Sequence, residues 1–224
     1  DPVLPDLTAL GRVVTFDRPG LGQSPVGTSP RTPTAIAREL GGVMQALDLP
    51  GPVILVGHSM GGVHALRFAE LFPDAVAGVV LLDTPPPGFE EARRRLLTED
   101  ERAQRDAVLT EGRARAPEII GRERDGAESE QWTFDALSPA MPLTVVVADA
   151  QEFGSLGEPD AHRDLWLRMS EGWTDLSSAG TLEIAAGSGH MIHHDRTALV
   201  VDVIRRMIEA PAGSPAVAGT LRGS

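Results

Sequence analysis

The chain has 224 residues, 42% of them hydrophobic, and a formal net charge of −12 at pH 7. This length and apolar content suit one domain with a substantial core, and the acidic charge argues against binding to nucleic acid or to anionic membrane surfaces. The sequence has no cysteine, lysine or tyrosine, which excludes disulfides, thiolate nucleophiles, cysteine-bound zinc and Schiff bases on lysine. We expect a small-molecule substrate and neither a metal nor a cofactor.

Nothing in the sequence indicates transport or insertion into a membrane. No apolar stretch approaches the roughly 20 residues that a membrane-spanning helix needs, and no signal peptide is recognisable. We therefore expect a cytoplasmic protein.

The predicted elements alternate between strand and helix. A β-branched run over residues 12–16 ends at a loop rich in glycine and proline, which predicts a buried strand. Helical spacing of apolar residues predicts a helix over residues 34–47, with Thr32 or Thr34 as its N-cap. Further apolar runs predict strands over residues 53–56, 78–82, 143–148 and 181–185, and helices over residues 61–71 and 195–209. Because the strands are continuously apolar, they predict an α/β fold with a mostly parallel sheet covered by helices on both faces.

Residues 85–137 interrupt this alternation. Between Glu90 and Glu130, 12 acidic and 9 basic residues occur with few large apolar ones, which is typical of a solvated helical segment. We predict a core formed by residues 1–84 and 138–210, a helical insertion over residues 85–137, and a flexible tail over residues 211–224.

Residues 57–62, Gly-His-Ser-Met-Gly-Gly, lie between a predicted strand and a predicted helix. A G-x-S-x-G pattern in this setting is a nucleophile elbow, a sharp turn that exposes a serine hydroxyl to a base. Ser59 is the candidate nucleophile. Gly57 and Gly61 flank it because side chains there would collide with neighbouring backbone, and the amide of Met60 is a candidate oxyanion donor.

These segments resemble the α/β-hydrolase superfamily. Residues 17–24, Asp-Arg-Pro-Gly-Leu-Gly-Gln-Ser, are similar to the family's D-x-P-G-x-G-x-S loop after its fourth strand, and Gly189-His190 is similar to the G-H pair after its eighth. The resemblance covers residues 7–209 and implies that the insertion is a lid. Family members carry further strands and an H-G oxyanion loop before the loop at Asp17, so the 16 residues before Asp17 imply that the first strands are missing from this chain.

The resemblance also implies a catalytic triad of serine, acid and histidine. Ser59 corresponds to the nucleophile, and His190, which follows a turn of small residues, corresponds to the base. For the acid, the family most often uses a residue after the seventh strand, where Asp149 lies and Glu152 follows three residues later. A minority of families use the acid after the sixth strand, which corresponds to Asp83. All three candidates remain open.

Other polar residues near these motifs have structural interpretations. We expect His58 to pack behind the serine, and His193 and His194 to be exposed or to cap the last helix. Asp17 is expected to accept hydrogen bonds from amides of its own loop.

A serine at the elbow favours chemistry through an acyl-enzyme. Haloalkane dehalogenases and soluble epoxide hydrolases, the relatives with aspartate at this position, are disfavoured. The favoured activity is hydrolysis of carboxylic esters of small to medium apolar acids. The alternatives are a lactonase, an amidase or peptidase, a carbon–carbon bond hydrolase, a cofactor-free perhydrolase and, from another class, a non-catalytic ligand-binding protein on the same fold.

Overall fold

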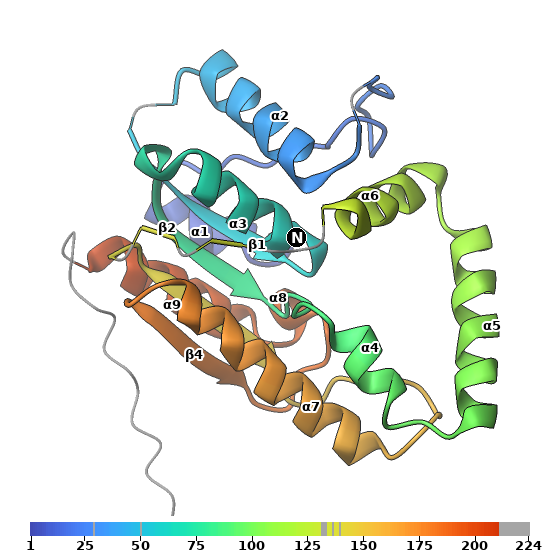
Figure 1. The fold of residues 1–224 in the computed structure, drawn as a ribbon. Helices are drawn as coiled ribbons and strands as arrows, with labels where there is room; N and C mark the ends of the chain where they lie inside the picture. Colours follow the sequence, from blue (N-terminus) through green and yellow to red (C-terminus); the bar gives the residue numbers. More distant parts are fainter. Residues whose placement is uncertain (29, 50, 131–133, 136, 139, 211–224) are drawn as a thin grey trace, which may run out of the picture.

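Four parallel strands form one sheet, in the order β1-β2-β3-β4, in the computed structural model of the chain. The structure describes residues 1–28, 30–49, 51–130, 134–135, 137–138 and 140–210, so the predicted tail lies outside the described residues. The strands are β1 (Val53–His58), β2 (Val76–Leu82), β3 (Leu143–Ala148) and β4 (Gly180–Ala185). Because they are parallel, their carboxyl ends lie at one edge of the sheet, where the arrowheads point in Figure 1.

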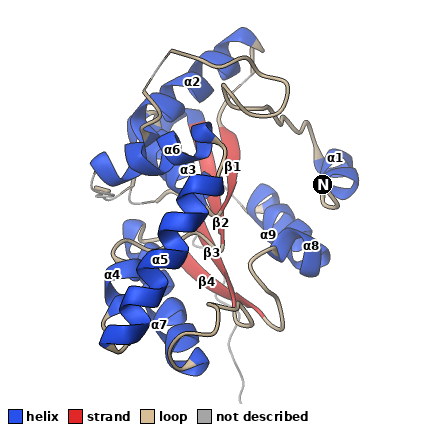
Figure 2. Ribbon diagram, turned by 90° about the vertical axis from the view of Figure 1, so that its right-hand side faces the viewer, coloured by secondary structure: helices blue, strands red, loops and turns tan. Residues whose placement is uncertain are grey.

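Helices cover both faces of this sheet, as the sequence predicts. Figure 2 shows α1, α8 and α9 on one face and α2, α3 and α7 on the other. The α-helices are α1 (Leu4–Leu10), α2 (Pro33–Ala46), α3 (Met60–Leu71), α4 (Phe89–Arg94), α5 (Glu99–Arg115), α6 (Glu118–Ser129), α7 (Pro159–Glu171), α8 (Ile192–Asp195) and α9 (Thr197–Glu209), and the 3-10 helices are η1 (Pro73–Ala75) and η2 (Gly172–Leu176). The helix predicted over residues 195–209 is thus divided, with α9 beginning at Thr197.

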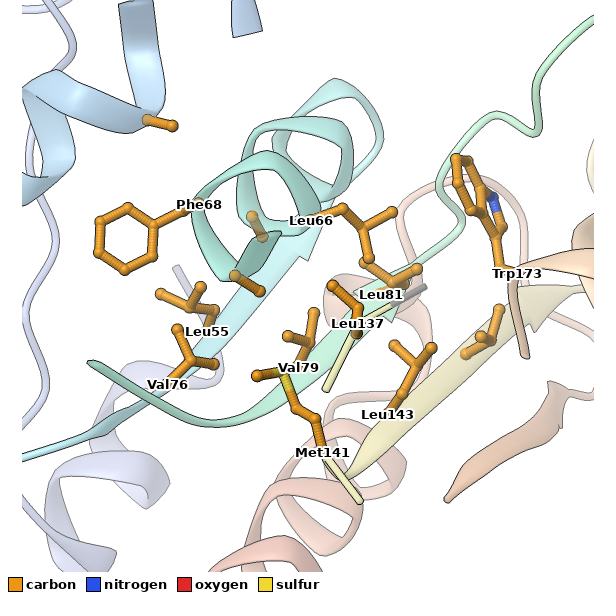
Figure 3. Packing of buried hydrophobic residues seen from close by; sticks show 14 of the residues in the cluster. Leu55, Leu66, Phe68, Val76, Val79, Leu81, Leu137, Met141, Leu143 and Trp173 are labelled. Atoms are coloured by element: carbon orange, nitrogen blue, oxygen red, sulfur yellow. The ribbon is translucent and has the colours of Figure 1, made fainter. Parts of the chain in front are cut away.

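The central strands are almost entirely apolar because each buries side chains on both faces. Leu81 and Val145 belong to the core under α3 and α7, which also contains Phe68 (Figure 3). Val80 and Val146, their neighbours along the strands, pack against α9 on the other face. Two cores on opposite faces of one sheet explain why these strands show no alternation of apolar and polar residues.

Residues 12–16 do not form the predicted strand. The segment is not assigned as strand, and Val14 and Phe16 are each 39% exposed. Val14 and Phe16 line a cavity of about 980 Å³ together with Val53 and Val56 of β1. The prediction is wrong because a strand needs a hydrogen-bonded neighbour, and β-branched composition alone supplies none.

Between β2 and β3 the chain forms the helices α4, α5 and α6. No residue of α5 is buried, which agrees with its high charge. The helix begins with a capping box, in which Thr98 Oγ1 accepts from the N–H of Glu101 and the Glu101 carboxylate accepts from the N–H of Thr98. The same carboxylate accepts from the N–H of Gly157 at 2.9 Å, which ties α5 to the segment after β3.

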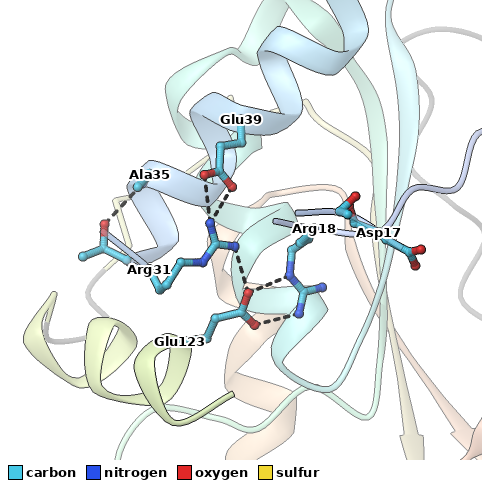
Figure 4. A network of polar contacts seen from close by, with 8 residues as sticks. Asp17, Arg18, Arg31, Ala35, Glu39 and Glu123 are labelled. Atoms are coloured by element: carbon cyan, nitrogen blue, oxygen red, sulfur yellow. Dashed lines mark hydrogen bonds and ion pairs between the residues drawn. The ribbon is translucent and has the colours of Figure 1, made fainter. Parts of the chain in front are cut away.

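A buried ion network holds α6 against the loop before α2 (Figure 4). Glu123 of α6 accepts hydrogen bonds from Arg18 at 2.7 and 3.0 Å and from Arg31 at 2.9 Å, and Arg31 also bonds Glu39 of α2 at 2.8 Å. Burial alone would lower the pKa of Arg31, but the hydrogen bonds to Glu123 and Glu39 outweigh burial and raise it. Burial would likewise raise the pKa of Glu123, yet the two arginines lower it. Arg31 and Glu123 therefore both stay charged, and the network joins α6, the loop before α2 and α2 itself.

The amino end of α2 provides a second attachment for α6. Thr32 is the N-cap, one of the two predicted candidates, and its hydroxyl accepts from the N–H of Ala35 at 3.2 Å. Glu130, just after α6, accepts from the N–H of Thr34 at 3.1 Å. The insertion is thus fixed at α6, and α5 lies on the solvent side.

Candidate active site

Ser59 occupies a strained turn between β1 and α3. Its backbone has φ 52° and ψ −129°, a conformation that non-glycine residues rarely adopt. The turn is held by two hydrogen bonds, from the N–H of Ser59 to the carbonyl of Leu82 and from the N–H of Gly62 to the carbonyl of Ser59, both 2.9 Å. A strand that turns sharply into a helix in this way has the geometry of a nucleophile elbow.

The glycines around Ser59 differ in how much space surrounds them. A Cβ at Gly57 would lie 2.5 Å from the carbonyl oxygen of Gly61 and from the Cα of Gly62, so the expected collision is present there. A Cβ at Gly61 would meet nothing within 4 Å, so the expectation for Gly61 is wrong. The second crowded position is Gly62, which packs directly against the side chain of Thr84.

Met60 is the first residue of α3. Its N–H therefore has no acceptor within the helix, since the first N–H groups of any α-helix lack one. The positive end of the helix dipole lies at the same place. This end of α3 can thus stabilise a negative charge that develops beside Ser59.

His190, in the loop after β4, bonds Asp83, which directly follows β2. The Nδ1–H of His190 donates to Oδ2 of Asp83 at 2.7 Å. The His190 side chain is 37% exposed, whereas the Asp83 side chain is 0% exposed. Because Nδ1 carries the proton in this bond, the neutral ring presents Nε2 as a free acceptor. Asp83 itself has φ 47°, which aspartate tolerates better than most residues.

The other two acid candidates do not contact His190. Asp149 follows β3 as predicted, but its Oδ1 accepts from the N–H of Gly187 at 2.6 Å and so orders the loop after β4. Glu152 is exposed to solvent. The structure therefore brings Asp83 to His190 and leaves Asp149 and Glu152 apart from it.

His58 joins the elbow to the loop that carries His190. Its Nε2–H donates to the backbone carbonyl of His190 at 2.8 Å, and the two rings lie 4.6 Å apart between centroids. Burial lowers the pKa of His58, so the ring is neutral at pH 7. The His193 ring also contacts the His58 ring, with centroids 4.7 Å apart, and burial lowers the pKa of His193 too. Ser59 Oγ and the His190 ring are not hydrogen-bonded in this structure, a contact that often tightens only when substrate binds.

Two residues that the sequence analysis did not single out hold His190 and Asp83 in place. Asp195, at the end of α8, accepts from the N–H of Gly189 at 2.9 Å and so fixes the residue before His190. Trp166 of α7 donates its Nε1–H to Oδ1 of Asp83 at 2.9 Å. Trp166 is 83 residues from Asp83 in the chain, and no local sequence pattern indicates such a contact. Asp17, by contrast, accepts from the N–H of Gln23 at 3.0 Å, the role expected for it.

The large cavity beside β1 is separate from this site, because none of Ser59, Asp83 and His190 lines it. Among the residues that the structure describes, no group of three or more His, Asp or Glu side chains is placed to hold a metal ion. Within the same residues, no helix is long and apolar enough to cross a membrane.

Comparison with known proteins agrees with the observed fold. The family model described as "alpha/beta hydrolase fold" matches residues 3–155. The chain belongs to this family. The α/β-hydrolase fold accounts for the parallel sheet with helices on both faces.

The relatives differ in how much of the chain they match. The uncharacterized protein YqjL of Bacillus subtilis is 24% identical over 210 residues, which is 89% of this chain and 74% of that protein. Lipase LipV of Mycobacterium tuberculosis is 41% identical over 71 residues, 32% of this chain and 26% of the lipase. A solved thermophilic esterase from Thermogutta terrifontis superposes with a TM-score of 0.58 and 24% identity, covering 92% of this chain and 83% of the esterase.

The difference between the two glycines around Ser59 predicts a difference in stability. Gly57→Ala should destabilise the protein by about 2–3 kcal/mol, because its methyl group meets rigid backbone on the facing turn. Gly61→Ala should leave stability unchanged or raise it slightly, because the site is open and alanine favours the helix. Urea unfolding of the two variants measures this, and equal losses would contradict the assignment of Gly57 as the crowded position.

Proposed function

We propose that this α/β-hydrolase is a serine hydrolase that cleaves carboxylic esters of small to medium apolar acids through an acyl-enzyme. The observation that carries the proposal is the 2.7 Å bond between His190 Nδ1 and the buried Asp83 carboxylate, in a loop that His58 ties to the elbow. In the triad logic, the acid holds the histidine tautomer and stabilises the imidazolium that forms during the reaction.

In the first half of the proposed reaction, Ser59 Oγ attacks the ester carbonyl while its proton passes to His190 Nε2. The carbonyl π electrons move to the oxygen, whose negative charge is stabilised by the N–H of Met60 at the start of α3. The tetrahedral intermediate then collapses, the bond to the alcohol breaks, and His190 returns the proton to the leaving alkoxide. The products are an acyl group on Ser59 and a free alcohol.

In the second half, water attacks the acyl carbonyl and gives a proton to His190. The bond to Ser59 Oγ breaks, the proton returns to Oγ, and the carboxylic acid leaves. Asp83 accepts the Nδ1–H bond throughout and need not itself be protonated. No redox step and no cofactor enters this sequence.

The choice of esters rests on relatives whose names include a lipase and an esterase. We propose that the insertion over residues 85–137 acts as the lid. It begins two residues after Asp83, and α6 is held in place by Glu123, so this segment can bound the substrate.

Hydrolysis of nitrophenyl esters of increasing acyl length tests the proposal. Ser59→Ala should lose several orders of magnitude in kcat, because triad members act as a unit, and His190→Ala should do the same. His193→Ala and His194→Ala are the matched controls and should keep most of the activity. If Ser59→Ala retains more than a few per cent of the wild-type rate, or if the folded wild-type chain hydrolyses no ester, the proposal fails.

The acid is tested by a matched pair of isosteric changes. Asp83→Asn should lower kcat by about 10⁴-fold, because an amide stabilises the wrong histidine tautomer. Asp149→Asn should have a small effect, since Asp149 bonds the amide of Gly187 and not His190. Steady-state kinetics of both variants decide between them. A large loss in Asp149→Asn alone would reverse the assignment.

A further inference from the structure

The carboxylate of Asp83 receives hydrogen bonds from three separate elements. His190 donates to Oδ2, while Oδ1 accepts from the backbone N–H of Ala148 at 3.1 Å and from the indole Nε1–H of Trp166 at 2.9 Å. The Asp83 side chain is completely buried, and Trp166 is 3% exposed. A buried carboxylate is costly unless such donors satisfy it.

The two donors on Oδ1 determine which way the carboxylate faces. A carboxylate can rotate about its bond to Cβ, and although its two oxygens are equivalent, only one plane of the group directs one oxygen at His190 Nδ1 and the other at both remaining donors. The amide of Ala148 is fixed within β3, and the indole of Trp166 is carried by the helix α7. With both bonds in place, rotation would break two hydrogen bonds in a dry environment.

The indole is itself held by aromatic neighbours. Phe89 of α4 meets the Trp166 ring edge-on, with centroids 4.7 Å apart and an interplanar angle of 80°. Phe153, after β3, lies 5.6 Å away. These contacts leave the indole little freedom to turn, and they link the first helix of the insertion to the acid.

We propose that Trp166 is a positioning residue for the reaction. Its indole N–H orients the Asp83 carboxylate toward His190, and through it sets the orientation of the imidazole. Trp166 does not touch substrate and acts only through Asp83. The proposal rests on the proposed function, in which Asp83 is the triad acid.

Trp173 provides a matched control in the same core. It is also 3% exposed, and its Nε1–H donates to the backbone carbonyl of Thr84 at 3.2 Å, one residue beyond Asp83. Replacing either tryptophan by phenylalanine removes a buried indole and one hydrogen bond. Only the change at Trp166 removes a bond to the carboxylate.

The test compares Trp166→Phe with Trp173→Phe in three measurements on the full chain: kcat and KM on a nitrophenyl ester, urea unfolding, and the low-field proton NMR signal of His190 Nδ1–H. Trp166→Phe should lower kcat by about 10- to 100-fold, the loss expected for one hydrogen bond to a charged group, with KM unchanged and the NMR signal shifted or broadened. Trp173→Phe should lose similar stability while keeping kcat within about two-fold and the NMR signal in place.

A third variant restores the donor. In Trp166→His, the imidazole Nε2–H can take the position of the indole N–H, so kcat should exceed that of Trp166→Phe although the smaller ring packs less well. If both Phe variants lose activity equally, if Trp166→Phe keeps the wild-type kcat and NMR signal, or if the His variant is no better than the Phe variant, the proposal is wrong. Should the wild-type chain hydrolyse no ester, the proposed function fails, and the NMR signal still decides whether Trp166 orients the pair.

Discussion

The alignment of parallel strands at one edge of the sheet is the constraint on which the candidate site depends. In the register between β1 and β2, His58 lies opposite Leu82, so Ser59 and Asp83 leave their strands side by side. The N–H of Ser59 bonds the carbonyl of Leu82 at 2.9 Å, which ties the two turns together. A shift of one residue in this register would move Ser59 away from Asp83.

The burial of Asp83 makes the site depend on elements beyond β1 and β2. A carboxylate that is completely inaccessible to solvent must be satisfied by the protein, and here the donors come from β3, α7 and the loop after β4. The loop is ordered in turn by Asp149 and Asp195, which accept from its amides. The site at this edge of the sheet therefore forms only when β3, helix α7 and the loop after β4 are all in place.

The sequence predicted those parts of the site that depend on local patterns. The elbow at Ser59, the position of His190 and the strands β1 to β4 follow from glycine spacing and apolar runs. The strand predicted over residues 12–16 does not form, because pairing depends on a neighbour and not on composition. Asp83 and Asp149 each follow a strand, so a local pattern does not distinguish them. The structure does, because His190 bonds Asp83 whereas Asp149 bonds the amide of Gly187. The contact of Trp166 in α7 with Asp83 was not predicted, since it spans 83 residues.

Covalent labelling with a fluorophosphonate, followed by peptide mapping, tests most directly whether Ser59 is an activated nucleophile. Cleavage at arginine releases residues 39–67 as one peptide, which contains Ser59 and no other serine or threonine. The account predicts a single adduct per chain, carried by this peptide at Ser59, because only a serine beside an oriented histidine reacts readily with such probes. Folded protein that remains unlabelled, or that carries the adduct on a different peptide, would contradict it.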